Sequence, residues 1–193
     1  MGSKDRTPGL PLYYSKWASR FTWAAIIQGG IVALLTAMLA GFSVSVEYPR
    51  KLVEMMLVQP EIGFSEVTAL AGLGLYLVVG VIGTGITAQF YHHFEVRENK
   101  PYRGFISNAL AWTHLFLMNI GVAATGLMMI YSGYLGDVAV TPRELGGFGM
   151  TVEQASQQIL NPFIMPVASM LLVVVAGAVA GGTGFIMNNF MRR

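Results

Sequence analysis

The chain has 193 residues, of which 54% are hydrophobic and only 11% are charged. A soluble globular domain carries about 25% charged residues, so this composition excludes a protein whose whole surface faces water. The net charge of +2 is small and the cations stand in short loops, so we expect no nucleic-acid partner. The chain has no cysteine, which excludes disulfides, thiolate-held iron–sulfur clusters and c-type heme attachment.

Four long stretches contain no Asp, Glu, Lys or Arg and are rich in apolar residues. A hydrocarbon core about 30 Å thick takes about 20 helical residues to cross, and each stretch can supply them. The apolar runs are continuous rather than alternating, so they do not fit barrel strands, and backbone groups in lipid must be satisfied within each helix. We therefore predict an all-α integral membrane four-helix bundle, a single domain over residues 1–193. The expected helices span residues 21–46, 67–93, 104–135 and 162–190.

The start of the chain predicts a retained first helix, because no apolar stretch precedes Phe21 and no cleavage site follows soon after. The first long loop, residues 47–66, encloses the apolar stretch 52–58, which predicts a short helix along the membrane surface.

The second long loop ends in helix-start signals. Thr151 followed by Gln154 predicts a capping box that opens a short helix. Asn161 and Pro162 then predict the N-cap and first turn of a separate fourth helix, which Pro166 is expected to bend.

The distribution of basic residues predicts the orientation. Seven of the ten acidic residues lie in the two long loops, with only three of the twelve basic residues beside them. The other nine basic residues are Lys4, Arg6, Lys16, Arg20, Arg97, Lys100, Arg103, Arg192 and Arg193. The positive-inside rule therefore predicts a multi-pass protein of the cell (plasma) membrane with both termini in the cytoplasm.

Small residues recur at helical spacing and predict close approach of helices. The rows are Ala33, Ala37 and Gly41 in the first helix, Gly72, Tyr76, Gly80 and Thr84 in the second, and Gly177 and Gly181 in the fourth. These faces fit packing within the bundle, and they also fit docking onto another membrane subunit.

Three histidines are the candidate cofactor-binding residues. His114 lies about 15 Å inside the third helix, whereas His92 and His93 lie at the end of the second. This difference in depth disfavours a heme b held between them, but His114 remains a candidate single ligand or a neutral, hydrogen-bonded residue. His92 and His93 are expected to reach the headgroups, to pair with Glu95 or Glu98, or to contact a quinone headgroup.

The spans contain no carboxylate, which disfavours a self-contained pump, transporter or channel. Among their milder polar residues, Asn119 and Thr125 suit hydrogen bonds between helices. The spacing predicts no metal site and no catalytic residue.

The order of parts resembles a known family. The residues that carry the likeness are Tyr13-Tyr14-Ser15-Lys16-Trp17, Gly63-Phe64-Ser65-Glu66-Val67, Asn108-Ala109-Leu110-Ala111-Trp112 and Met129-Ile130-Tyr131-Ser132-Gly133-Tyr134. Together they resemble the first four helices of the catalytic subunit of heme–copper terminal oxidases, in the B-type branch. The family has a heme-ligating histidine early in its second helix, and the matching stretch, residues 66–71, has none.

The resemblance implies a relative without the heme and copper ligands, and none of the family's ligand residues carries over. We therefore expect an accessory, non-catalytic transmembrane subunit of a respiratory complex, a terminal oxidase first, with heme and copper in partner subunits and none held by this chain alone. The alternatives are a small b-type cytochrome or a quinone-binding membrane anchor, and then a small transporter or channel. Other membrane subunits, lipids and a quinone are the expected partners.

Overall fold

The computed structural model describes residues 15–45 and 64–190, and within these ranges it is helical and contains no strand. The first helix is α1 (Lys16–Ser45) and the third is α5 (Phe105–Val140). The second is a continuous run of α3 (Phe64–Leu75), the π-helix η1 (Tyr76–Gly83), α4 (Thr84–His92) and the π-helical turn η2 (His93–Arg97). The fourth joins α6 (Val152–Ala155), the π-helical turn η4 (Ser156–Leu160) and α7 (Asn161–Phe190), after the short 3₁₀ turn η3 (Arg143–Leu145).

The predicted all-α fold with four candidate spans is confirmed for the described part of the chain. Four segments are long and apolar enough to cross a membrane: Lys16–Met38, Val67–Arg97, Phe105–Val140 and Val152–Phe190. The chain is therefore a membrane protein. The four helical runs begin earlier, end later, or both, compared with the predicted ranges. The surface helix predicted for residues 52–58 lies outside the described residues.

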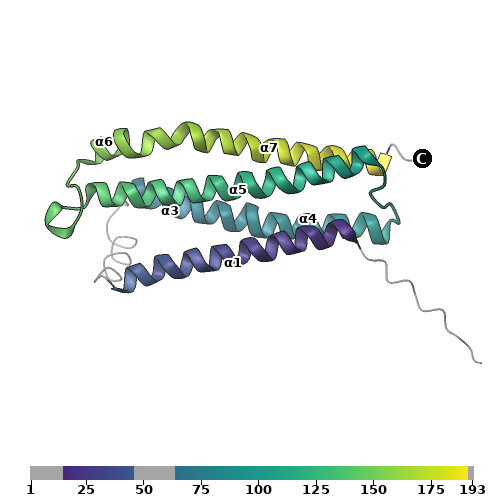
Figure 1. The fold of residues 1–193 in the computed structure, drawn as a ribbon, viewed down its shortest axis with the longest axis horizontal. Helices are drawn as coiled ribbons and strands as arrows, with labels where there is room; N and C mark the ends of the chain where they lie inside the picture. The colour runs from purple at the N-terminus through teal and green to yellow at the C-terminus, as the bar shows by residue number, and fades with distance from the viewer. Residues whose placement is uncertain (1–14, 46–63, 191–193) are drawn as a thin grey trace, which may run out of the picture.

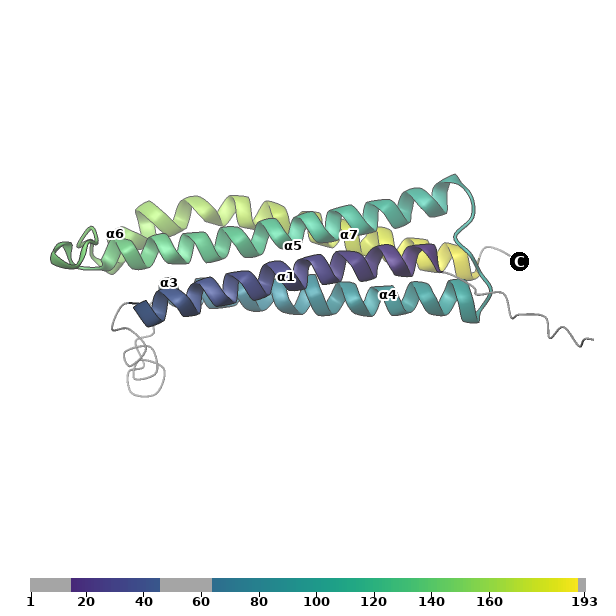
Figure 2. The same cartoon turned by 60° about the horizontal axis from the view of Figure 1, so that its bottom comes forward.

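The four runs alternate in direction, so α1 begins and α7 ends at the same end of the bundle (Figure 1). We call this the terminal end and the opposite one the far end. Two pairs form the bundle, with α1 beside the second run and α5 beside α7 (Figure 2). The pairs meet mainly through α5, which packs against α3 toward the far end and against α7 along its length.

The core is densest at the terminal end, where aromatic rings from all four runs meet. Phe21 stacks on Tyr91 with ring centroids 4.8 Å apart. Tyr102 and Phe185 each lie 4.9 Å from the same Tyr91 ring. This aromatic core closes the terminal end of the bundle, so each helix is fixed there by large, interlocking side chains.

The predicted start of a separate fourth helix at Asn161 is wrong. Asn161 has helical dihedrals (φ −56°, ψ −39°), and the helix runs through it from Val152. A proline inside an α-helix lacks one hydrogen bond and clashes with the carbonyl four residues before it. The wider π-helical turn over Ser156–Leu160 ends two residues before Pro162, and it includes Gln158, whose carbonyl a regular α-helix would place against the proline ring. The capping box of Thr151 and Gln154 is confirmed by reciprocal hydrogen bonds of 3.0 and 3.2 Å.

Candidate functional site

His114 is buried in the aromatic core of the terminal end, with 6% of its surface exposed. Its ring centroid lies 5.0 Å from that of Phe21 on α1 and 6.3 Å from that of Phe185 on α7. The hydroxyl of Tyr91 on α4 lies 3.5 Å from Nδ1 of the imidazole, within hydrogen-bond distance. His114 therefore contacts side chains from the three other helices.

The imidazole of His114 also lies against the backbone of α7 at Gly181. A Cβ added to Gly181 would collide with Nδ1, Cε1 and Cγ of His114. One turn earlier, a Cβ on Gly177 would come within 2.8 Å of the backbone nitrogen of Met118. The two glycines are thus used for the crossing of α7 and α5 within this chain. The alternative, that this pair docks another subunit, is not the arrangement found.

A heme held by two histidines needs a second imidazole opposite the first. The two other histidines of the chain, His92 and His93, are exposed at the end of the second run and do not contact His114 in any observed interaction. The burial of His114 and its contact with the Tyr91 hydroxyl fit the hydrogen-bonded histidine that was the other interpretation of the sequence.

His92 and His93 lie apart from this core and are exposed. They line a surface hollow of about 450 Å³ whose other walls include Ile86, Gln89, Phe90 and Arg97. The lining combines apolar side chains with imidazole, amide and guanidinium groups, at the end of a candidate span. Chemically, this hollow can take a flat apolar group that carries hydrogen-bond acceptors.

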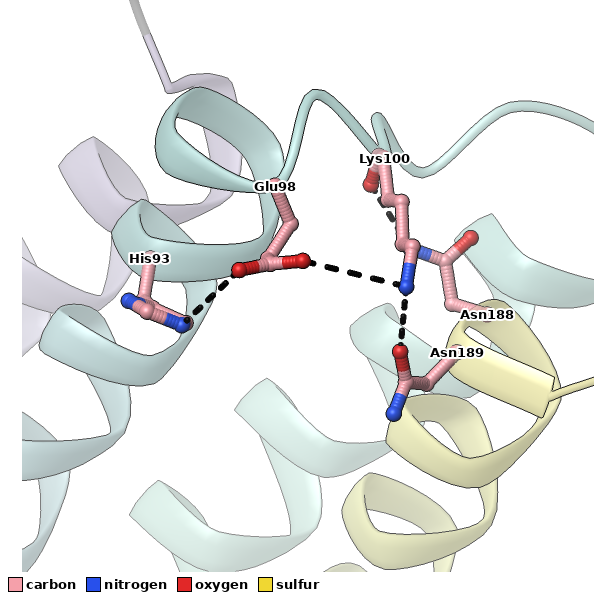
Figure 3. Close-up of polar contacts among 5 residues, drawn as sticks. All are labelled: His93, Glu98, Lys100, Asn188 and Asn189. Carbon is pink, nitrogen blue, oxygen red and sulfur yellow. Dashed lines mark hydrogen bonds and ion pairs between the residues drawn. The ribbon is translucent and has the colours of Figure 1, made fainter.

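A polar network joins this region to the end of α7 (Figure 3). Nε2 of His93 lies 3.6 Å from the Glu98 carboxylate, as the sequence predicted, and Glu98 lies 4.0 Å from Nζ of Lys100. Lys100 donates to Oδ1 of Asn189 at 2.5 Å, and Asn188 donates to the backbone carbonyl of Lys100 at 2.7 Å. The loop after η2 is therefore tied to the last turn of α7.

Glu95, the other predicted partner of the histidines, instead serves the first turn of α1. Its carboxylate accepts hydrogen bonds from the Ser15 hydroxyl at 2.5 Å and the Trp17 backbone N–H at 3.3 Å. The Ser15 hydroxyl oxygen in turn accepts from the Ala18 backbone N–H at 3.0 Å. Sequence reasoning missed this contact because 78 or more residues separate the partners. The available signal was a serine directly before the first helix.

Tyr102 lies in the loop before α5, outside the candidate spans. Its hydroxyl is buried and has no hydrogen-bond partner within the described part of the chain. Burial, and then the negative charge of Glu95, raise the pKa of Tyr102 above its usual range. The hydroxyl therefore stays protonated at neutral pH.

A second polar group lies deeper, where three helices meet. The Gln28 amide on α1 donates to Oδ1 of Asn119 on α5 and lies 3.5 Å from Oγ1 of Thr84 on α4. Asn119 also donates to the carbonyl of Leu115 at 2.6 Å. The expected role of Asn119 in joining helices is confirmed. The expectation for Thr125 is wrong, because its hydroxyl is buried without a partner among the described residues.

The described residues contain no group of three or more His, Asp or Glu side chains placed to hold a metal ion. A scan against protein-family models finds no match to the chain, and searches of curated proteins and of solved structures find none either.

Proposed function

We propose that this chain is a non-catalytic transmembrane subunit of a respiratory electron-transfer complex, with a terminal oxidase as the first candidate. The observation that carries the proposal is the enclosure of His114 by the rings of Phe21, Tyr91 and Phe185. The histidine at membrane depth acts as a packing residue, so the helix surfaces remain for function. The resemblance of the helix order to oxidase catalytic subunits supports the choice of complex.

The outward face of α7 supports a role among other membrane proteins or lipids. Leu172, Val175 and Val179 are each more than half exposed, and α7 packs chiefly against α5 within the chain. Exposed apolar side chains carry no free-energy penalty in contact with lipid, and they can also pack against a neighbouring helix.

The test is affinity purification of the tagged, full-length chain from its native membrane in mild detergent, with the co-purifying proteins identified. A reduced-minus-oxidised spectrum is taken on the same sample. We expect oxidase catalytic chains to co-purify, and their heme bands to persist after this subunit is stripped away and in the His114→Phe variant. A solitary chain with its own b-type band, lost in that variant, would contradict the proposal.

A quinone-binding membrane anchor is the second candidate, favoured by the hollow that His92 and His93 line with Phe90. An imidazole can donate to a quinone carbonyl, and a phenyl ring can stack on the quinone plane. A photoreactive quinone analogue should label residues 86–97, and His92→Ala with His93→Ala should lower that labelling. Phe105→Ala, at an exposed residue near the same end that does not line the hollow, is the matched control. Labelling that both variants leave unchanged would refute this candidate.

A further inference from the structure

A third hollow, of about 350 Å³, opens at the terminal end where the first turn of α1 meets the loop before α5. Lys16 and Trp17 contribute from α1, Arg103 and Asn108 from the loop and the start of α5, and Glu95 and Asn99 from η2 and the turn after it. We call it the Lys16–Arg103 pocket.

The pocket is electropositive, although a carboxylate lines it. The Glu95 carboxylate already accepts the Ser15 hydroxyl and the Trp17 backbone N–H, so its charge is directed at the first turn of α1. Lys16 and Arg103, in contrast, form no ion pair within residues 15–45 and 64–190. Arg20 adds a third cation nearby, because its guanidinium lies 4.5 Å from the Trp17 ring centroid.

Side-chain contacts within the chain join two walls of the pocket. Nε1 of Trp17 donates to Oδ1 of Asn108 at 3.2 Å, which joins its α1 wall to its α5 wall. Trp112, one turn along α5, contacts the Trp17 ring edge-on at 5.3 Å, and the Arg20 guanidinium also lies over the Trp112 ring, 4.4 Å from its centroid. Trp17, Asn108 and Trp112 are therefore held by contacts that do not require a ligand.

The position of the pocket identifies the class of ligand. Lys16 opens the first candidate span and Arg103 stands two residues before the third. The headgroup layer of a bilayer lies at this level, just outside the hydrocarbon. Below the pocket, Trp112 and Phe116 stack at 5.1 Å on the exposed side of α5, where an acyl chain would run.

We propose that the Lys16–Arg103 pocket binds the phosphate group of an anionic phospholipid. Ammonium and guanidinium groups are the side chains that bind phosphate best, because both donate charge-assisted hydrogen bonds. The apolar strip of Trp112 and Phe116 selects a phosphate that carries acyl chains over a soluble one.

The test is native mass spectrometry of the full-length chain in a neutral detergent, with equal amounts of phosphatidylglycerol and phosphatidylcholine added. The pocket variant is Lys16→Gln with Arg103→Gln. The charge-matched control is Arg97→Gln with Arg143→Gln, which removes two arginines that do not line the pocket. Helix content by circular dichroism shows whether each variant folds. If the glutamine variant does not fold, Lys16→Arg with Arg103→Lys is used instead, and it should keep the preference because it keeps both charges.

We expect the unaltered chain to retain phosphatidylglycerol over phosphatidylcholine. The pocket variant should bind phosphatidylglycerol about 30-fold more weakly, since each cation near an anionic lipid surface contributes about fivefold. The control should keep the preference. Equal retention of the two lipids, or equal loss in both variants, would overturn the proposal. Displacement of the lipid by excess inorganic phosphate would also overturn it, because the pocket would then bind a soluble phosphate.

Discussion

Gly181 and His114 face each other where α7 crosses α5. Because glycine has no Cβ, the backbone of α7 can lie directly against the His114 ring. The imidazole lies against the Gly181 backbone, while the neighbouring Gly182 has open space around its added Cβ. Lipid gives no hydrophobic drive for helix association, so close backbone packing of this kind supplies much of the attraction between helices. The two adjacent glycines therefore differ in one respect, their contact with α5.

We predict that Gly181→Leu destabilises the bundle and Gly182→Leu does not. A leucine at residue 181 must displace the His114 ring, and overpacking of this kind costs about 1–3 kcal/mol. Both changes replace glycine by leucine in the same helix, so their effect on helix propensity is the same. The free energy of unfolding in mixed micelles, followed by circular dichroism, measures the difference. Equal values for the two variants would mean that the α5–α7 crossing does not depend on this contact.

At this scale the sequence predicted which residues matter better than it predicted their partners. The four-residue spacing of Gly177 and Gly181 was visible, but a spacing says only that some backbone comes close. His114 was singled out because a histidine at membrane depth is costly to bury. The Tyr91 hydroxyl and the aromatic neighbours offset the cost of burying His114. These neighbours depend on how each helix is rotated about its axis, which a single sequence does not specify.

The first turn of α1 receives hydrogen-bond acceptors from a residue of another helix, Glu95 on η2. A helix start leaves backbone N–H groups without partners, and it carries a partial positive charge. The Glu95 carboxylate on η2 satisfies the Trp17 N–H and the Ser15 hydroxyl together. The first turn of α1 is thus held against the end of the second helix.

We predict that Glu95→Gln loosens the first turn of α1. The variant keeps an acceptor oxygen but loses the negative charge, which is worth about 0.3–1 kcal/mol at a helix start. Amide hydrogen exchange over residues 16–19 should accelerate by up to about fivefold, since 1 kcal/mol corresponds to that factor. Glu98→Gln is the control, because Glu98 follows the same π-helical turn but pairs with His93 and Lys100 rather than with α1. Faster exchange in both variants, or in neither, would argue against a role for Glu95 in capping α1.

The fourth helix shows why element boundaries were harder to predict than elements. Asparagine followed by proline is a common helix start, and the local pattern gave no reason to prefer continuation. The observed helix runs through both residues, and a π-helical turn over Ser156–Leu160 lies just before them. The second helix has a similar insertion, η1, beside the polar contact of Gln28 and Thr84. Hydrophobic periodicity does not distinguish π-helical turns from α-helical ones, so both were invisible in the sequence.

For the whole molecule, helix length and residue charge agree on how the bundle sits in a bilayer. At about 1.5 Å per residue, the 36 residues of α5 extend about 54 Å, more than the 40–45 Å of a bilayer with its headgroups. Counted from Phe105, that thickness ends at about residues 131–134, where Tyr131 and Tyr134 are exposed as interfacial aromatics are. Asp137, η3 and the start of the fourth helix then extend beyond the far interface.

Orientation is the property of the whole molecule that the fold alone leaves open, and the excess of basic residues at the terminal end predicts that this end is cytoplasmic. The chain has no cysteine, so single cysteines report the side of the membrane without a background. In intact cells, a membrane-impermeant maleimide should label Val152→Cys at the far end and leave Asn99→Cys unlabelled until the cells are permeabilised. Both residues are exposed, and the left-handed backbone at Asn99 (φ 49°) tolerates cysteine at a cost of about 1 kcal/mol.

Labelling of Asn99→Cys alone would reverse the orientation, and labelling of both or neither in intact cells would contradict four spans. If the predicted pattern is found, the His92–His93 hollow and the Lys16–Arg103 pocket both face the inner leaflet, where anionic lipids would reach the pocket.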